Sequence, residues 1–180
     1  TNNSPGGFEV YRKGPQVIRQ GSRGHDWGSG RTGPQNILIF PDRSITQSTG
    51  PYDTEGGMRA LSPIIGAIGL VTGSPADLRG EVRQWLSDGT PGADVDFVSV
   101  DLTRAYDSVQ YHDRYNPARV TRYVRDFVYF RSVSGQGSDR LVILDRAQTT
   151  DPKFEKNWLF HTATEPMVNG SPTPGPARGI

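Results

Sequence analysis

The chain has 180 residues, which fits one domain, and a formal net charge of +1 at pH 7. Glycine (22 residues) and proline (14 residues) make up one residue in five, which excludes a helical bundle, and no regular glycine period points to collagen. The longest mainly apolar run, residues 64–71, is far shorter than the roughly 20 residues of a membrane helix. A near-neutral chain also lacks a general field for nucleic acid. We therefore expect neither a membrane nor a nucleic acid as partner.

Few side chains of the sequence suit metal or covalent chemistry. Cysteine is absent, which excludes disulfides, thiolate metal sites and cysteine nucleophiles. His25, His112 and His161 lie too far apart in the sequence for the usual metal-ligand spacings. His161 follows an apolar run, where a hydrogen-bonded histidine at a strand end is expected. We expect no metal and no cofactor.

Arginine makes up seventeen of the twenty basic residues. A guanidinium group suits planar, bidentate contact with carboxylate, phosphate or sulfate. Arginine also forms ordinary surface ion pairs, so both interpretations of the composition stay open.

The first forty residues predict three short strands. Residues 8–20 predict two of them, separated by Gly14, and residues 37–40 predict a third, buried strand. The turn-rich residues 21–36 indicate a loop. Residues 41–63 are polar and glycine-rich, a long connection of the kind that usually has a functional reason.

Residues 76–88 predict a short helix. Leu78, Val82, Trp85 and Leu86 follow one another at spacings of four, three and one, which is typical of one helix face.

The second half of the chain alternates more clearly between apolar and polar residues. Residues 96–101 and 119–132 predict strands, and residues 140–145 predict a third. A turn at residues 134–138 predicts that the last two pair as a hairpin. Residues 157–161 close the set.

One face of the strand over 119–131 carries the candidate binding residues. Tyr123, Arg125, Tyr129 and Arg131 share strand parity and therefore leave the same face. Aromatic rings and guanidinium groups on one face suit recognition of acidic sugars. An ordinary outer sheet face, whose long side chains cover apolar surface, is the alternative.

The fold class that follows is mainly β: an antiparallel β-sandwich of two packed sheets with at most one short helix. Residues 1–170 form a single domain, and residues 171–180 a tail rich in proline and glycine. We expect Trp158, the largest side chain of the closing strand, to be mostly buried, and Trp158→Ala to cost about 3–5 kcal/mol of stability.

Four pieces of the sequence, taken in order, resemble the C-terminal domain of heparinase II/III-like polysaccharide lyases. They are D-L-T-R-A-Y (101–106), R-Y-V-R-D-F-V-Y-F (122–130), L-V-I-L-D-R (141–146) and F-E-K-N-W-L-F-H-T (154–162). Near the N-terminus, F-E-V-Y-R-K-G-P (8–15) and Q-N-I-L-I (35–39) are similar to strands of the same domain. The resemblance covers most of residues 8–170 and is weakest over 41–94.

The resemblance implies a β-sandwich that follows a helical toroid in lyases that cleave uronic-acid polysaccharides by β-elimination. It also implies secretion to an extracellular or periplasmic location. The helical half of such lyases, which carries most of their catalytic residues, is not in this sequence.

The resemblance further places a metal cluster at three positions that are substituted here. They correspond to Asn2, Arg19 and Gln35, none of which is a good metal ligand. Arg19 would set a positive charge where the cation sits. The simplest interpretation is that this domain has lost the metal.

Two hypotheses about function remain. In the first, the chain is the β-sandwich domain of a polysaccharide lyase and is not catalytic alone. In the second, it is a non-catalytic carbohydrate-binding or assembly module derived from such a lyase. An acidic polysaccharide, the helical domain or like subunits are the expected partners. No signal peptide precedes Thr1. Because residues 8–11 already predict a strand and a tail rich in proline and glycine closes the chain, we expect a mature or truncated piece of a longer product.

Overall fold

A computed structural model describes residues 6–11, 14–17, 36–41, 56, 80–87, 94–107, 119–132, 138–164, 167–168 and 171–172. These residues are mainly β, and the helix among them, α1, is five residues long. The elements in chain order are β1 (Val10–Tyr11), β2 (Pro15–Val17), β3 (Leu38–Ile39), β4 (Glu81–Leu86), β5 (Val95–Asp101), α1 (Thr103–Asp107), β6 (Val120–Phe130), β7 (Arg140–Thr149), β8 (Asn157–Trp158), β9 (Met167–Val168) and β10 (Ser171–Pro172).

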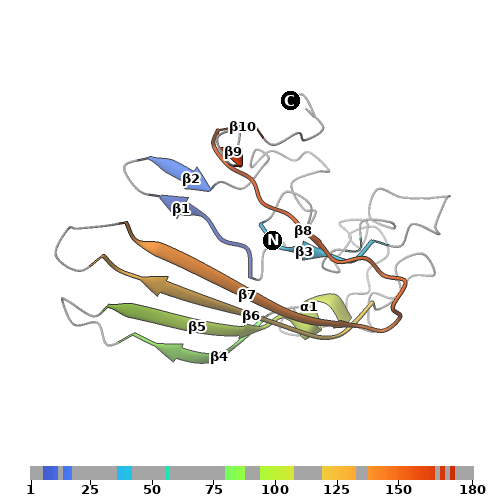
Figure 1. Cartoon of the computed structure of the whole chain (residues 1–180). Helices are drawn as coiled ribbons and strands as arrows, with labels where there is room; N and C mark the ends of the chain where they lie inside the picture. The colour runs from blue at the N-terminus through green and yellow to red at the C-terminus, as the bar shows by residue number, and fades with distance from the viewer. Residues whose placement is uncertain are drawn as a thin grey trace, which may run out of the picture.

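One layer of the fold is a four-stranded antiparallel sheet in the order β4-β5-β6-β7 (Figure 1). Strands β6 and β7 form the predicted hairpin, with Arg125 opposite Asp145 and Phe127 opposite Ile143. The strand predicted at residues 96–101 is β5, which pairs with both β4 and β6.

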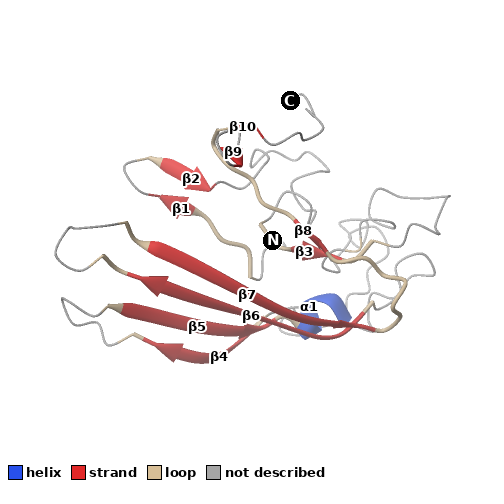
Figure 2. Ribbon diagram, viewed as in Figure 1, coloured by secondary structure: helices blue, strands red, loops and turns tan. Residues whose placement is uncertain are grey.

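Short two-stranded sheets form the second layer (Figure 2). Strand β1 pairs with β2, and β3 pairs with β8, which brings Leu38 opposite Trp158. A bridge between Val17 and Thr162 joins the two pairs. The layer lies over one face of the four-stranded sheet, and no other described element covers the opposite face. We call these the inner and the outer face. The prediction of a mainly β, antiparallel sandwich with at most one short helix is confirmed over the described residues.

The core lies between the layers, near the end of the sheet that carries α1. The rings of Phe40, Tyr106 and Tyr123 meet edge to face, with centroids 5.2–5.9 Å apart, and are almost completely buried. The hydroxyl of Tyr106 donates to the carbonyl of Leu38 at 2.7 Å, so the buried ring also satisfies a backbone acceptor.

The helix predicted at residues 76–88 is wrong where the structure describes it, because residues 81–86 form strand β4. A β-bulge makes Arg83 an extra residue: Val82 pairs with Val100 but Gln84 with Ser99. The bulge puts Val82 and Trp85 on the same sheet face. Their spacing of three residues therefore imitates a helix.

The prediction that Trp158 is mostly buried is also wrong, since the residue is 46% exposed. Its indole stacks on Phe160, which is 44% exposed, at the open edge of the layer rather than in the core. A cost of 3–5 kcal/mol for Trp158→Ala applies to a fully buried ring and is too large here.

The C-terminal residues add one small feature. Ser171 and Pro172, at the start of the predicted tail, pair with Val168 and Met167. Of the helices in the described part of the chain, none is long and apolar enough to cross a membrane.

The outer face of the four-stranded sheet exposes apolar side chains. Strand pairing places Phe130, Val142 and Leu144 on this face, and each is 41–53% exposed. Leu86 and Val95, from β4 and β5, extend the apolar surface.

Candidate functional site

Two of the four predicted binding residues lie in the core. Tyr123 and Arg125 point to the inner face and have no exposed surface, so the expectation that they contact a polysaccharide is contradicted by their burial. Arg125 binds the Asp145 carboxylate through Nε and Nη2, both at 2.7 Å. Its Nη1 donates to the carbonyls of Gly6 and Asn36 at 2.8 and 2.6 Å. Arg125 therefore ties three segments of the sandwich together.

The charge of Arg125 is balanced where it is buried. Burial alone would lower its pKa, but the hydrogen bonds and charge of Asp145 outweigh that effect and raise it. Burial also raises the pKa of Tyr123, whose hydroxyl donates to the same carboxylate at 3.0 Å. The buried cluster therefore consists of the neutral phenol of Tyr123, the carboxylate of Asp145 and the guanidinium of Arg125, and the carboxylate accepts hydrogen bonds from both of the others.

The other two predicted binding residues are held by neighbouring carboxylates. The hydroxyl of Tyr129 donates to Asp139 at 2.9 Å, and Arg131 forms an ion pair with Asp96. The four residues share the predicted face, but only these two reach the surface.

The three substituted metal positions of the resemblance, Asn2, Arg19 and Gln35, lie outside the described residues. Within the described ranges, no group of three or more histidine, aspartate or glutamate side chains could hold a metal ion. His161 is hydrogen-bonded as predicted: its backbone N–H donates to Asn36 Oδ1 at 2.7 Å, and its ring Nδ1 lies 3.2 Å from the same atom. Burial lowers the pKa of His161.

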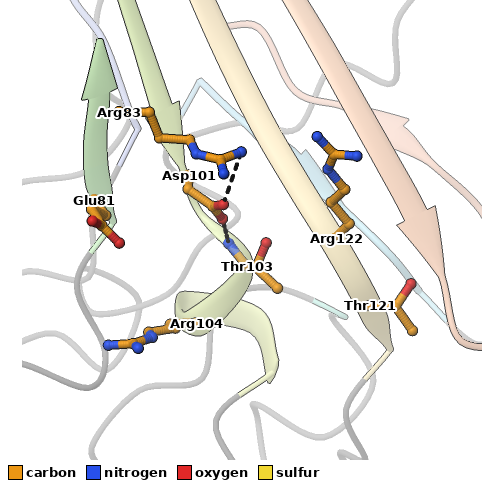
Figure 3. Close-up of a pocket in the computed structure, with 7 residues that line it drawn as sticks. All are labelled: Glu81, Arg83, Asp101, Thr103, Arg104, Thr121 and Arg122. Atoms are coloured by element: carbon orange, nitrogen blue, oxygen red, sulfur yellow. Dashed lines mark hydrogen bonds and ion pairs between the residues drawn. The ribbon is translucent and has the colours of Figure 1, made fainter.

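A hollow of about 550 Å³ opens on the outer face where β4, β5 and β6 meet α1 (Figure 3). This volume is within the range of about 300–1,000 Å³ of small-molecule sites. Arginines come to it from three elements: Arg83 from β4, Arg104 from α1 and Arg122 from β6. The remaining lining residues are Glu81, Asp101, Thr103 and Thr121.

Two β-bulges shape this hollow. Arg83 is the extra residue of the bulge in β4. Thr121 is the extra residue of a second bulge, because Val120 pairs with Thr149 but Arg122 with Gln148. Bulges re-aim side chains and are common beside functional sites. Both bulges lie at the same end of the sheet. Two irregularities that are far apart in the sequence therefore lie beside the same hollow.

Asp101 partly neutralises the hollow. It pairs with Arg83 at 3.5 Å and accepts the backbone N–H of Thr103 at 2.9 Å. Its partial burial would raise its pKa, but the bonds from Thr103 and the charges of Arg83 and Arg122 lower it overall. Asp101 is therefore ionised, and its carboxylate is already bound by Arg83 and Thr103.

Arg104 and Arg122 keep unused hydrogen-bonding capacity. Among the described residues, neither forms an ion pair or a hydrogen bond through its guanidinium group, and both are exposed. Figure 3 shows Arg122 and Arg83 on either side of Asp101, with Arg104 extending from α1 toward the side of Glu81. Exposed guanidinium groups with open donors suit contact with anionic groups.

Sequence reasoning did not single out Arg83, Arg104 or Arg122. The excess of arginine over lysine was the available signal, but it does not say which arginines converge. Each comes from a different element, and β4 and β6 both carry a bulge beside the hollow that the alternation pattern conceals.

Comparison with known proteins adds no relative: no protein-family model matches the chain, and no curated protein matches it at a significant level.

Proposed function

We propose that this chain is the β-sandwich domain of a heparinase II/III-like polysaccharide lyase, that it holds an acidic polysaccharide, and that it does not cleave the polymer alone. The motifs, taken in their order along the sequence, support an origin from such a lyase. The sandwich agrees with the fold of the C-terminal lyase domain that the motifs resemble. The proposal implies an extracellular or periplasmic location.

The observation that carries the binding role is the arginine-lined hollow on the outer face. Arg83, Arg104 and Arg122 present guanidinium groups from three elements around one opening. Guanidinium groups bind carboxylate and sulfate groups with two hydrogen bonds each. A uronic-acid polymer carries a carboxylate on each uronate unit, so it offers the matching groups in a row.

The residues of the hollow suit binding of an acidic polysaccharide better than its cleavage. β-Elimination needs a base that removes a carbon-bound proton. Asp101 is a weak base because its pKa is lowered and its carboxylate already accepts hydrogen bonds. The arginines can bind and orient an acidic sugar but cannot accept a proton.

Removing Arg104 and Arg122, which are unpaired among the described residues, tests the proposal. We expect Arg104→Ala/Arg122→Ala to weaken binding of alginate and heparan-type oligosaccharides at least about tenfold at low salt, since two charge-assisted contacts are lost. Binding by the unmodified chain should weaken with added salt, because exposed charges are screened within about 8 Å at physiological ionic strength. Isothermal titration at two salt concentrations measures both effects.

Arg140→Ala is the matched control. Arg140 is exposed at the far end of the sheet, about 26 Å from Arg122 at 3.3 Å per strand residue. Arg140→Ala removes one positive charge without touching the hollow, so affinity should be unchanged. No binding at low salt, or an equal loss in the control and the double variant, would contradict the proposal.

A second candidate function, assembly of like subunits, is favoured by the apolar outer face. Monomeric proteins rarely leave large contiguous apolar patches exposed. If two copies meet through this face, sedimentation velocity should show association that rises with concentration. Leu144→Glu, at a residue 53% exposed, should then abolish it without unfolding the domain. A single monomeric species at every concentration would exclude this candidate.

A further inference from the structure

Three aromatic rings form a column on the side of the second layer. Trp158 stacks on Phe160 with centroids 5.2 Å apart and an interplanar angle of 11°. Phe160 in turn stacks on Phe8 at 6.3 Å and 30°. Phe8 meets Phe127 of β6 edge to face at 5.9 Å, so the column is anchored in the sandwich. Trp158 ends the column, and the residue is 46% exposed.

A second hollow opens beside this tryptophan. It measures about 460 Å³ and lies between β8 and the inner face of β7. Its walls are Leu38, Ile143, Asp145, Ala147, Lys156 and Trp158. The hollow is therefore mostly apolar, with one aromatic wall, one carboxylate and one ammonium group.

The two charged groups of the hollow differ in what they can offer a ligand. Asp145 is already neutralised, since Arg125 binds it through two nitrogens at 2.7 Å. Lys156 is exposed, and no ion pair is found for it in the part of the chain that the structure describes. The charge that the hollow offers to a ligand is therefore the positive charge of Lys156.

We infer that this hollow binds one uronic-acid ring of a saccharide, stacked on the indole of Trp158 with its carboxylate toward Lys156. The C–H groups of a pyranose ring are slightly positive and meet the negative face of an aromatic ring. Stacking on Phe160 fixes the orientation of the indole, which reduces the side-chain entropy lost when a ligand binds. A volume of 460 Å³ falls within the range of small-molecule sites.

This site is separate from the arginine hollow. Tyr123 points to the inner face, so its neighbour Arg122 points to the outer face, whereas Ile143 and Asp145 line the second hollow from the inner face. The inference rests on the proposed function for its ligand class only. The two sites can therefore be removed one at a time.

Indole N–H signals in two-dimensional NMR test the inference. The chain has three tryptophans, of which Trp85 is 69% exposed on β4 and serves as the internal control. Trp158→Phe and Trp85→Phe assign the signals. On titration with alginate oligosaccharides we expect the Trp158 signal to move and the Trp85 signal to stay. Neutral cello-oligosaccharides should shift the Trp158 signal less at equal concentration.

Affinity measurements complete the test. Trp158→Ala should weaken alginate binding roughly tenfold, while Trp85→Ala leaves it unchanged. Lys156→Gln should reduce the preference for the uronic-acid over the neutral oligosaccharide. Because Trp158 is half-exposed, its replacement should leave the fold intact, which a thermal melt of each variant checks.

The outcomes separate the two sites. If Arg104→Ala/Arg122→Ala weakens binding and Trp158→Ala does not, the second site is overturned and the proposed function stands. If only Trp158→Ala weakens binding, the second site stands and the arginine hollow is not the binding site. An unmoved Trp158 signal with either ligand, or equal shifts of Trp158 and Trp85, overturns the inference.

Discussion

Replacing Arg125 with alanine is expected to lower the free energy of unfolding by about 3–5 kcal/mol, the usual cost of breaking a buried ion pair from one side. The substitution leaves the Asp145 carboxylate, 11% exposed, without its cation. It also removes the donor to the carbonyls of Gly6 and Asn36, which lie on segments far away in the sequence. Urea unfolding followed by tryptophan fluorescence measures the difference.

Arg131→Ala is the control for this prediction. Arg131 also pairs with an aspartate, Asp96, but its side chain is 41% exposed, so its loss should cost less than about 1 kcal/mol. A double variant, Arg125→Met/Asp145→Leu, should recover part of the loss because no charge then remains buried. Equal effects of Arg125→Ala and Arg131→Ala would contradict the structural role of Arg125.

The regular strands could be predicted from the sequence because period-two alternation is a local signal. Residues 119–132 and 140–145 alternate and are joined by a turn, and they form the hairpin of β6 and β7. Frequent glycine and proline excluded long helices. Fold class follows from such local constraints without knowledge of which strands face the core.

The irregular positions could not be predicted in this way. A bulge adds one residue and reverses the faces of all that follow, so the pattern on either side of it is no longer in phase. In β4 this gave Val82 and Trp85 the spacing of a helix. In β6 it placed both Val120 and Tyr123 in the core, although their parity differs.

The burial of the candidate binding residues could not be predicted from the sequence either. Alternation showed that Tyr123 and Arg125 share a face, but not that a second layer covers it. Arginine is mostly found at the surface, so the pattern favoured a binding face. The missed signal is Asp145, which the hairpin register sets directly opposite Arg125. An acidic partner in register is what allows arginine to be buried.

Replacing Gly56 with alanine is expected to cost at least about 3 kcal/mol. Gly56 has φ +68°, which costs an L-residue about 1–2 kcal/mol. A Cβ at this position would lie 2.0 Å from the carbonyl oxygen of Phe40, and backbone has no side-chain freedom with which to give way. Phe40 is completely buried between Tyr106 and Tyr123, so moving its backbone disturbs the aromatic core. The midpoint of urea unfolding should fall accordingly.

Gly14→Ala separates the two contributions. Gly14 has φ +138°, and a Cβ there would meet nothing within 4 Å, so only the backbone strain remains. Its cost should stay below that of Gly56→Ala, because it consists of backbone strain alone. The excess cost at Gly56 then measures the close approach to Phe40, which is also held by a hydrogen bond of 2.7 Å from its N–H to the Gly56 carbonyl. If the two substitutions cost the same, Gly56 does not pack against the end of β3 as described, and the aromatic core is not braced from that side.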